Sequence, residues 1–409
     1  MDGEYESMTE LDYASSEAKP HKRRKRFSLF KVLVCVILVV IIAIAGIGLR
    51  YSTDIRETLY GIFSSSSSEF TYSVNADSVI SLTAHKNGFL VLTNTLAAYV
   101  DSSGDVIGSA TLSYSSPRAD VAGKWSIVFD RSGTSYHLAK NGRSTGENTT
   151  DAEIINCAVA SNGYYAVVTQ SEDSNAILYV YSSSGSLKFA VSFATSYVVD
   201  VALYNRSKAA VVSVNTVDGD LYSYITIYDY GYSEPYCTFE LEDTVVACKY
   251  FTSSKLLVVG KSGVYYIDDN VLTTVCTFTS DTLEYSSFTD NGLVTVSVSD
   301  TDSSVSDVRI ISKKGEITSS FTVSGTITAF DCTQDYLAFL IGSDVSIYNT
   351  DGAVVGSVEG IKSGTEIVMG QAYVYILENS EIVSYSAFGE AQQDEDELVS
   401  GVQEIEIDE

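Results

Sequence analysis

The chain has 409 residues and carries 25 Lys and Arg against 53 Asp and Glu, which gives a net charge of −28. This acidic balance argues against a nucleic-acid-binding protein, because such a protein needs a basic surface to displace phosphate counterions. Hydrophobic residues make up 45% of the chain, which is enough to build a core. Three His, six Cys and one Trp leave little material for histidine catalysis, zinc clusters or a disulfide framework.

An uncharged segment follows a basic run near the N-terminus. Residues 32–49 read VLVCVILVVIIAIAGIGL, beginning with Val32 and ending with Leu49. As a helix this segment is about 27 Å long, which matches the hydrocarbon thickness of a bilayer. A soluble helix does not need apolar residues on every side over such a length. We predict an uncleaved membrane anchor; the alternative is a cleaved signal peptide, whose A-x-A site at 43–45 would fall inside the apolar run.

The charges beside this segment predict its orientation. Cytoplasmic flanks of membrane helices are rich in Lys and Arg, so we expect a cytoplasmic N-terminus and an extracytoplasmic remainder. The basic residues that set this topology, and that would also contact anionic lipid, are Lys22, Arg23, Arg24, Lys25 and Arg26. The predicted parts are a disordered basic tail at 1–31, a transmembrane helix at 32–49, a Ser-rich stalk at 50–68, a folded domain at 69–389 and a disordered acidic tail at 390–409.

Two short sequence patterns alternate along the folded domain. One is an apolar run, as in FLVLT at 89–93 and YVYIL at 373–377. The other is a hairpin sequence that usually ends in Gly, as in AYVDSSG and SIYNTDG, where Gly104 and Gly352 supply a residue with positive φ. Each pattern recurs eight times with a period of about 41 residues, which is the length of one β-propeller blade.

The apolar runs favour a propeller over other all-β folds. Blades pack face to face, so their middle strands are covered on both sides and lose the alternation of apolar and polar residues. Tandem immunoglobulin-like domains would repeat at about 100 residues and show a Cys…Trp…Cys pattern, which the sequence lacks. We predict an all-β fold, an eight-bladed β-propeller with seven blades as the alternative, outside the membrane and preceded by one transmembrane helix.

The eighth repeat has no fourth strand of its own, because the sequence turns acidic at Glu390. An unpaired strand edge invites aggregation. The sequence FTYSV at 70–74 follows the Ser-rich linker and has no repeat of its own. We therefore predict that this N-terminal strand completes the last blade and closes the ring.

The layout of basic tail, single span, Ser-rich stalk and Ser-, Tyr- and Asp-rich blades resembles uncharacterised membrane-anchored propeller proteins of Gram-positive bacteria, over roughly residues 20–390. More distantly, the chain resembles WD-repeat and quinoprotein-type propellers. It lacks the Gly-His and Trp-Asp signatures of the former. With Trp125 as its one tryptophan, it also lacks the repeated tryptophan motif of the latter. The resemblance therefore implies a fold and a location, and it transfers no cofactor and no functional residue.

Three connections between second and third strands are unusually long and acidic, at 170–175, 215–223 and 299–307. Such connections emerge on one face of a propeller, so their carboxylates are expected to share a rim. Hard oxygen ligands of this kind suit Ca²⁺, although solvated turns on an acidic protein explain the same residues and no EF-hand spacing is present. The candidate calcium ligands are Asp218, Asp220, Asp300, Asp302 and Asp307.

The sequence contains no catalytic motif. Cys157 and Cys248 recur at equivalent places, as do Cys237 and Cys276, which indicates buried blade residues rather than a metal cluster, with one disulfide between blades left open. We predict a non-enzymatic binding or scaffold module for an extracytoplasmic protein or glycan, because loops on a rigid propeller carry its function. The alternative is an enzyme that acts on glycans or cell-wall material through axial carboxylates.

Overall fold

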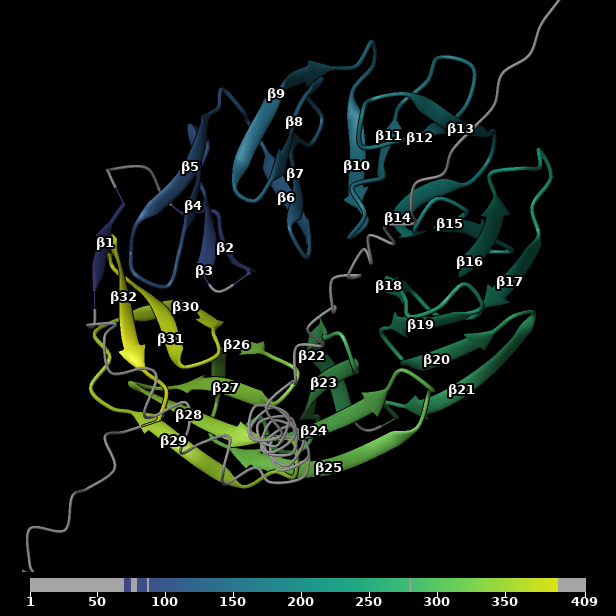
Figure 1. Cartoon of the computed structure of the whole chain (residues 1–409). Helices are drawn as coiled ribbons and strands as arrows, with labels where there is room; N and C mark the ends of the chain where they lie inside the picture. The colour runs from purple at the N-terminus through teal and green to yellow at the C-terminus, as the bar shows by residue number, and fades with distance from the viewer. Residues whose placement is uncertain (1–69, 75–78, 87, 280, 389–409) are drawn as a thin grey trace, which may run out of the picture. The chain divides into compact units, whose positions relative to one another are not determined.

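Each repeat folds into one four-stranded antiparallel sheet, and the described residues contain eight such sheets. The structure is a computed structural model and describes residues 70–74, 79–86, 88–279 and 281–388 (Figure 1). The sheets succeed one another around an axis, and in each of them the first strand lies innermost and the fourth lies at the outside (Figure 1). The prediction of an eight-bladed β-propeller is therefore confirmed, and the seven-bladed alternative is wrong.

The blades are numbered here in chain order. Blade 1 consists of β2 (Ser81–His85), β3 (Gly88–Leu92), β4 (Leu96–Val100) and β5 (Val106–Thr111), and blade 2 of β6 (Pro117–Ala122), β7 (Trp125–Asp130), β8 (Ser135–Lys140) and β9 (Arg143–Thr149). Blade 3 consists of β10 (Ile154–Val159), β11 (Tyr165–Thr169), β12 (Ala176–Tyr181) and β13 (Leu187–Phe193), and blade 4 of β14 (Tyr197–Tyr204), β15 (Lys208–Val217), β16 (Asp220–Asp229) and β17 (Cys237–Leu241). Blade 5 consists of β18 (Val245–Tyr250), β19 (Lys255–Gly260), β20 (Gly263–Asp268) and β21 (Val271–Thr277), and blade 6 of β22 (Asp281–Phe288), β23 (Gly292–Ser299), β24 (Val305–Ser312) and β25 (Ile317–Ser324). Blade 7 consists of β26 (Ile327–Cys332), β27 (Tyr336–Ile341), β28 (Asp344–Asn349) and β29 (Val354–Val358), and blade 8 of β30 (Gly364–Met369), β31 (Tyr373–Glu378), β32 (Glu381–Ser386) and β1 (Thr71–Ser73).

The apolar runs of the sequence form the second strands of the blades. β3, β7, β11 and β31 are buried along their whole length. Their side chains join apolar clusters between neighbouring blades, as where Phe89 and Val91 of blade 1 pack with Tyr375 and Leu377 of blade 8. Both faces of these strands are thus covered, which explains why their sequences do not alternate.

The N-terminal strand closes the ring, as predicted. β1 pairs antiparallel with β32, and Tyr72 lies opposite Ile382. The Phe70 carbonyl accepts a hydrogen bond of 2.9 Å from the Ser384 N–H, and the Phe70 ring centroid lies 6.0 Å from that of Tyr375. Blade 8 therefore combines strands from both ends of the domain.

Two glycines show why the turns repeat. The Gly292 Cα approaches the third strand of its own blade so closely that a Cβ there would stand 1.9 Å from the Ile311 carbonyl oxygen. Gly352 adopts a φ of 84°, and a Cβ at this position would meet the Phe321 ring of the preceding blade. Glycine is required at the first by close approach and at the second by both backbone conformation and space.

The antiparallel order gives the ring two distinct faces. We call the face that carries the connections between second and third strands, and those between blades, the B–C face. We call the opposite face, which carries the turns between first and second and between third and fourth strands, the C–D face. Every functional surface discussed below lies on one of these faces or around the axis.

Several predicted parts lie outside the described residues, namely the basic tail, the apolar segment at 32–49, the stalk and the acidic tail. Within the described ranges, no helix is long and apolar enough to cross a membrane. The cysteines of these ranges are free, so the disulfide that the sequence left open is not formed. Cys157 and Cys248 are buried as expected, whereas Cys237 and Cys276 are only partly buried.

One element differs from its prediction. The segment 215–223 is not a long loop, because β15 continues to Val217 and β16 starts at Asp220. Cross-strand pairing holds throughout this segment, up to the pair of Val217 with Asp220, and only Asp218 and Gly219 form the turn. Both turn residues have positive φ, which is the conformation of a tight two-residue hairpin. The polar sequence concealed a hairpin that projects from blade 4.

Candidate interaction surface

The acidic residues predicted on blade 4 lie at the tip of the β15–β16 hairpin. Asp218 and Asp220 are exposed to solvent there. Asn215, Thr216 and Val217 pair only with β16, because the pairing of β14 with β15 ends at Val214. The hairpin tip is therefore a two-stranded ribbon that stands clear of the rest of the sheet.

The acidic residues predicted on blade 6 have local hydrogen-bond partners. Asp302 accepts hydrogen bonds of 3.0 and 2.6 Å from the backbone N–H and the hydroxyl of Ser304, and these bonds lower the pKa of its carboxyl. Asp300 accepts a hydrogen bond of 3.0 Å from the Thr282 hydroxyl. Asp307 lies 3.5 Å from Arg309 Nη2. Each of these carboxylates is thus engaged within its own blade.

The predicted calcium ligands share the B–C face but belong to blades 4 and 6, with blade 5 between them. Among the residues that the structure describes, no group of three or more His, Cys, Asp or Glu side chains is arranged to hold a metal ion. The structure therefore does not gather Asp218 and Asp220 with Asp300, Asp302 and Asp307. Calcium binding stays a prediction.

An apolar group of side chains accompanies the acidic hairpin. Its members share the B–C ends of blade 4 and of the adjoining β18 and are between 41% and 63% exposed; Val217 and Leu221 lie on opposite faces of the hairpin, because Val217 pairs with Asp220 and Leu221 pairs with Thr216. Large apolar side chains gathered on one part of a soluble surface mark interaction sites more often than isolated ones do. We call this group the blade 4 patch; it consists of Tyr197, Val199, Val217, Leu221 and Val246.

Carboxylates surround the blade 4 patch. Asp218 and Asp220 flank it at the hairpin tip, and the exposed Glu240 and Glu242 lie at the outer end of the same blade. The Tyr222 hydroxyl donates a hydrogen bond of 3.2 Å to Glu242, which ties the hairpin to the start of the next connection. An apolar centre with a charged rim is the usual layout of a protein–protein interface.

The sequence alone did not reveal the patch. Val217 and Leu221 lie in the acidic connection predicted at 215–223, and their exposure arises because the hairpin extends beyond both neighbouring strands. In the structure β15 and β16 are 10 residues each.

Polar side chains on the innermost strands link neighbouring blades. Four acidic side chains on these strands each accept a hydrogen bond from a backbone N–H of the following blade. They are Asp120, Asp200, Asp331 and Glu366, and their donor–acceptor distances are 2.7, 3.0, 2.8 and 2.6 Å, respectively. Asp200 and Glu366 directly follow a β-bulge in β14 and β30, and such a bulge turns the next side chain toward a new direction. The donors are the N–H groups of Val159, Cys248, Met369 and Leu82.

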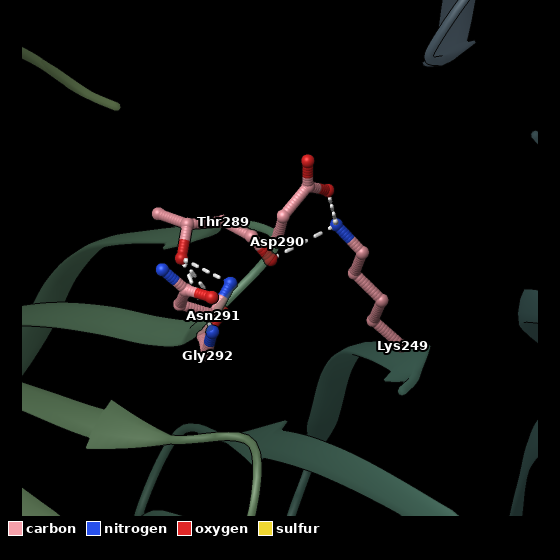
Figure 2. A network of polar contacts seen from close by, with 5 residues as sticks. All are labelled: Lys249, Thr289, Asp290, Asn291 and Gly292. Carbon is pink, nitrogen blue, oxygen red and sulfur yellow. Dashed lines mark hydrogen bonds and ion pairs between the residues drawn. The ribbon is translucent and has the colours of Figure 1, made fainter. Parts of the chain in front are cut away.

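Uncharged and basic side chains make the same kind of link at other junctions. Asn156 and Tyr285 donate hydrogen bonds to backbone carbonyls of blades 4 and 7. Lys249 Nζ donates to the Thr289 carbonyl of blade 6 at 3.1 Å and lies 3.9 Å from Asp290 (Figure 2). The Thr289 hydroxyl in turn accepts hydrogen bonds from the backbone of the same turn (Figure 2). The innermost strands are thus joined by side-chain hydrogen bonds at seven junctions.

Burial around the axis perturbs these acids. It raises the pKa of Asp200 and of Asp331 to about 6, and it also raises the pKa of Asp120 and of Glu366. A raised carboxyl pKa is one mark of a catalytic acid. Here the hydrogen bonds between blades give the carboxylates a structural task, so their pKa values do not by themselves indicate an enzyme.

Comparison with known proteins places the chain in a family and a fold. The profile of a family of unknown function, DUF5711, matches residues 59–382. No curated protein matches the sequence. Among solved structures, one titled as the eukaryotic initiation factor is similar, with a TM-score of 0.50, 11% identity and coverage of 76% of this chain and 84% of that one.

Two further similar structures have lower scores. BamB from Moraxella catarrhalis has a TM-score of 0.47 and 10% identity over 78% of this chain and 98% of its own. The Pan2 WD40 domain of Neurospora crassa has a TM-score of 0.40 and 11% identity over 53% of this chain and 71% of its own. At these identities the likeness concerns the fold alone.

Proposed function

This chain belongs to the family of unknown function DUF5711, and we propose that its eight-bladed propeller is a binding module that recognises a partner protein through the blade 4 patch. We further propose that one helix at 32–49 holds the module on the outer side of a membrane. The supporting observation is a projecting hairpin that exposes Val217 and Leu221 beside further exposed apolar residues of β14 and β18, with carboxylates at its tip and at the outer end of the blade.

The patch defines the chemistry of the partner. Burying the apolar side chains against another protein removes their surface from water, which is the main favourable term in association. Asp218, Asp220, Glu240 and Glu242 would attract Lys or Arg around that contact and raise the association rate. The expected partner therefore presents apolar side chains flanked by basic ones.

The membrane location rests on the sequence. The uncharged segment has the length of a bilayer core, and Lys22 to Arg26 precede it, which favours a cytoplasmic N-terminus. The resemblance to membrane-anchored propellers of Gram-positive bacteria supports the same arrangement. Protease digestion of intact cells should remove the propeller and leave a fragment that contains the first 31 residues; survival of the propeller would contradict the orientation.

Affinity capture tests the patch. The full chain in mild detergent is compared with a double variant, Val217→Ser and Leu221→Ser, and with a matched control, Val271→Ser and Val354→Ser, on the opposite face. All four side chains are exposed, so each variant is expected to fold. A partner held by wild type and control should be lost with the patch variant, and its binding should weaken as salt is raised because charges on the rim contribute.

Two outcomes of the affinity capture would contradict the proposed role of the blade 4 patch. Equal retention on the patch variant and the control would show that the partner binds elsewhere. Loss of the partner from both variants would point to an effect on the whole propeller and would remove the argument for blade 4.

A further inference from the structure

A second set of exposed apolar residues follows the rotational repeat of the propeller. Its members are the first residues of outermost strands in blades 1, 3, 5, 6 and 7, and they are between 46% and 60% exposed. We call this set the C–D ring; it consists of Val106, Leu187, Val271, Ile317 and Val354. Each begins its strand directly after the turn from the third strand, so all five lie at the C–D face.

The form of the C–D ring differs from that of the blade 4 patch. Its residues lie on five of the eight blades around the circumference, and blade 4 adds the exposed Tyr232 and Tyr236 in the corresponding turn. A compact protein partner would favour a concentrated patch in which a few central residues dominate. Apolar residues distributed around a rim suit a broad, flat surface that several blades reach together.

The chain also enters the propeller at the C–D face. β1 is the outermost strand of blade 8 and runs in the same direction as the other outermost strands, so its first residue lies at the end where their turns lie. Phe70 confirms this position, because a Cβ on Gly104, in the third-to-fourth-strand turn of blade 1, would stand 2.7 Å from the Phe70 ring. The described chain therefore enters the ring at Phe70 from this face.

The charges differ between the two faces. Exposed basic side chains at the C–D face include Lys86, Lys124, Arg143, Lys188 and Lys313, and they share it with turn carboxylates such as Asp101. The connections of the B–C face carry mainly carboxylates. The C–D face is thus the mixed face, on which long basic side chains can contact anionic groups.

We propose that the C–D face lies against the phospholipid headgroups of the bilayer in which the chain is anchored, with the C–D ring as the apolar contact. This inference rests on the proposed membrane anchor. The acidic B–C face, with the blade 4 patch, then points away from the lipid and is open to partners.

The tether makes weak lipid contacts sufficient. About 20 residues separate the apolar segment from Phe70 in the sequence, and a random coil of that length would span on the order of 25 Å. The propeller is therefore held near the lipid at a high effective concentration, so small contacts from several blades act together. Side chains of Val, Leu and Ile size reach only the interface, where apolar residues and Lys or Arg commonly lie together.

Added tryptophans test the orientation. The full chain has one tryptophan, Trp125, which is 6% exposed and serves as a constant background. Val354→Trp places a second tryptophan on the C–D ring, and Val217→Trp is the matched control on the B–C face. Each variant is reconstituted in vesicles of phosphatidylcholine and phosphatidylglycerol whose acyl chains carry bromine or, for reference, do not. The measurement is the difference in emission from wild type.

The expected result is asymmetric. The added emission of Val354→Trp should be blue-shifted and reduced on the order of two-fold by brominated lipid, because tryptophan favours the membrane interface. The added emission of Val217→Trp should be the same in both lipids. Equal emission of Val354→Trp in both lipids, or equal reduction in both variants, would overturn the proposal. A blue shift that depends on protein density but not on bromine would assign the ring to a second copy of the chain.

The proposed membrane anchor and the proposed orientation of the propeller are tested by separate measurements. Flotation of the vesicles reports whether the chain is held by lipid at all. A chain that does not float contradicts the anchor itself. A chain that floats while Val354→Trp stays insensitive to bromine contradicts only the contact of the C–D face with lipid.

Discussion

Replacement of Asp200 and Asp331 together by Asn should reduce the pH dependence of stability that we expect for the wild-type chain between pH 5 and 7. Burial raises the pKa of both carboxyls from 3.8 to about 6 in the folded chain. The folded chain therefore keeps two protons in a pH range in which the unfolded chain has released them. Both residues accept backbone hydrogen bonds between blades, so the titration occurs within the links that hold the ring together.

The sign and the size of the expected change in the free energy of unfolding follow from this difference in bound protons. Below about pH 3 both states are protonated, and above about pH 7 both are ionised, so the slope is small in these ranges. Between about pH 4 and 6 the free energy of unfolding falls as pH rises, at about 1.4 kcal/mol per pH unit for each group. As the pH rises from 5 to 7, the ionisation of each carboxyl should therefore lower the free energy of unfolding by about 1 kcal/mol.

Urea denaturation of the full chain in mild detergent at pH 5, 6 and 7 measures this effect. Asn keeps a carbonyl oxygen that accepts the N–H of Cys248 or Met369, and it does not titrate. The control is Asp218→Asn with Asp220→Asn, which removes the same number of charges from an exposed hairpin of a chain with a net charge of −28. If the axial double variant keeps the wild-type difference between pH 5 and 7, the assignment of the titration to Asp200 and Asp331 is refuted.

Three further predictions concern single positions. Phe70→Ala should lower the free energy of unfolding by about 2 kcal/mol, since a half-buried ring is lost from the closing strand, whereas the exposed Ser73→Ala should change it little. Gly292→Ala should lower the free energy of unfolding by about 1–3 kcal/mol through overlap with the third strand, and by more than Gly231→Ala, where an added Cβ would stand 3.6 Å from the nearest atom; equal costs would contradict the steric argument. Glu366→Ala should lower the free energy of unfolding by about 1–3 kcal/mol, because it leaves the N–H of Leu82 in blade 1 unpaired. Glu366→Gln should keep most of this stability, since the amide oxygen can accept the same hydrogen bond. A Gln variant as unstable as the Ala variant would show that the charge rather than the hydrogen bond matters.

The two faces of the propeller give a single arrangement for the proposed function. The entry of the chain at Phe70, the C–D ring and the basic side chains occupy one face, while the blade 4 patch and most loop carboxylates occupy the other. A module held in this way presents its partner-binding hairpin at the greatest distance from the lipid. The axial carboxylates hold the blades in place between the two faces.

The sequence by itself determined the repeat, the number of blades and the closure of the ring. Second strands such as β3 and β31 are covered on both sides by neighbouring blades, so their apolar composition is local and visible. The turn glycines are equally local, because their conformation depends on a few adjacent residues. The unpaired FTYSV sequence was recognisable because the count of strands left one place empty.

The tertiary structure decided which polar residues link the blades and which apolar residues stay exposed. Glu366 meets the N–H of Leu82, which is 284 residues away in sequence, and Asp120 meets that of Val159 one blade further on. Val217 lies in a segment predicted as a connection, Val354 resembles a buried strand residue in sequence, and the exposure of both depends on where neighbouring strands end. Such properties arise from contacts between distant segments, which periodicity along the chain does not encode.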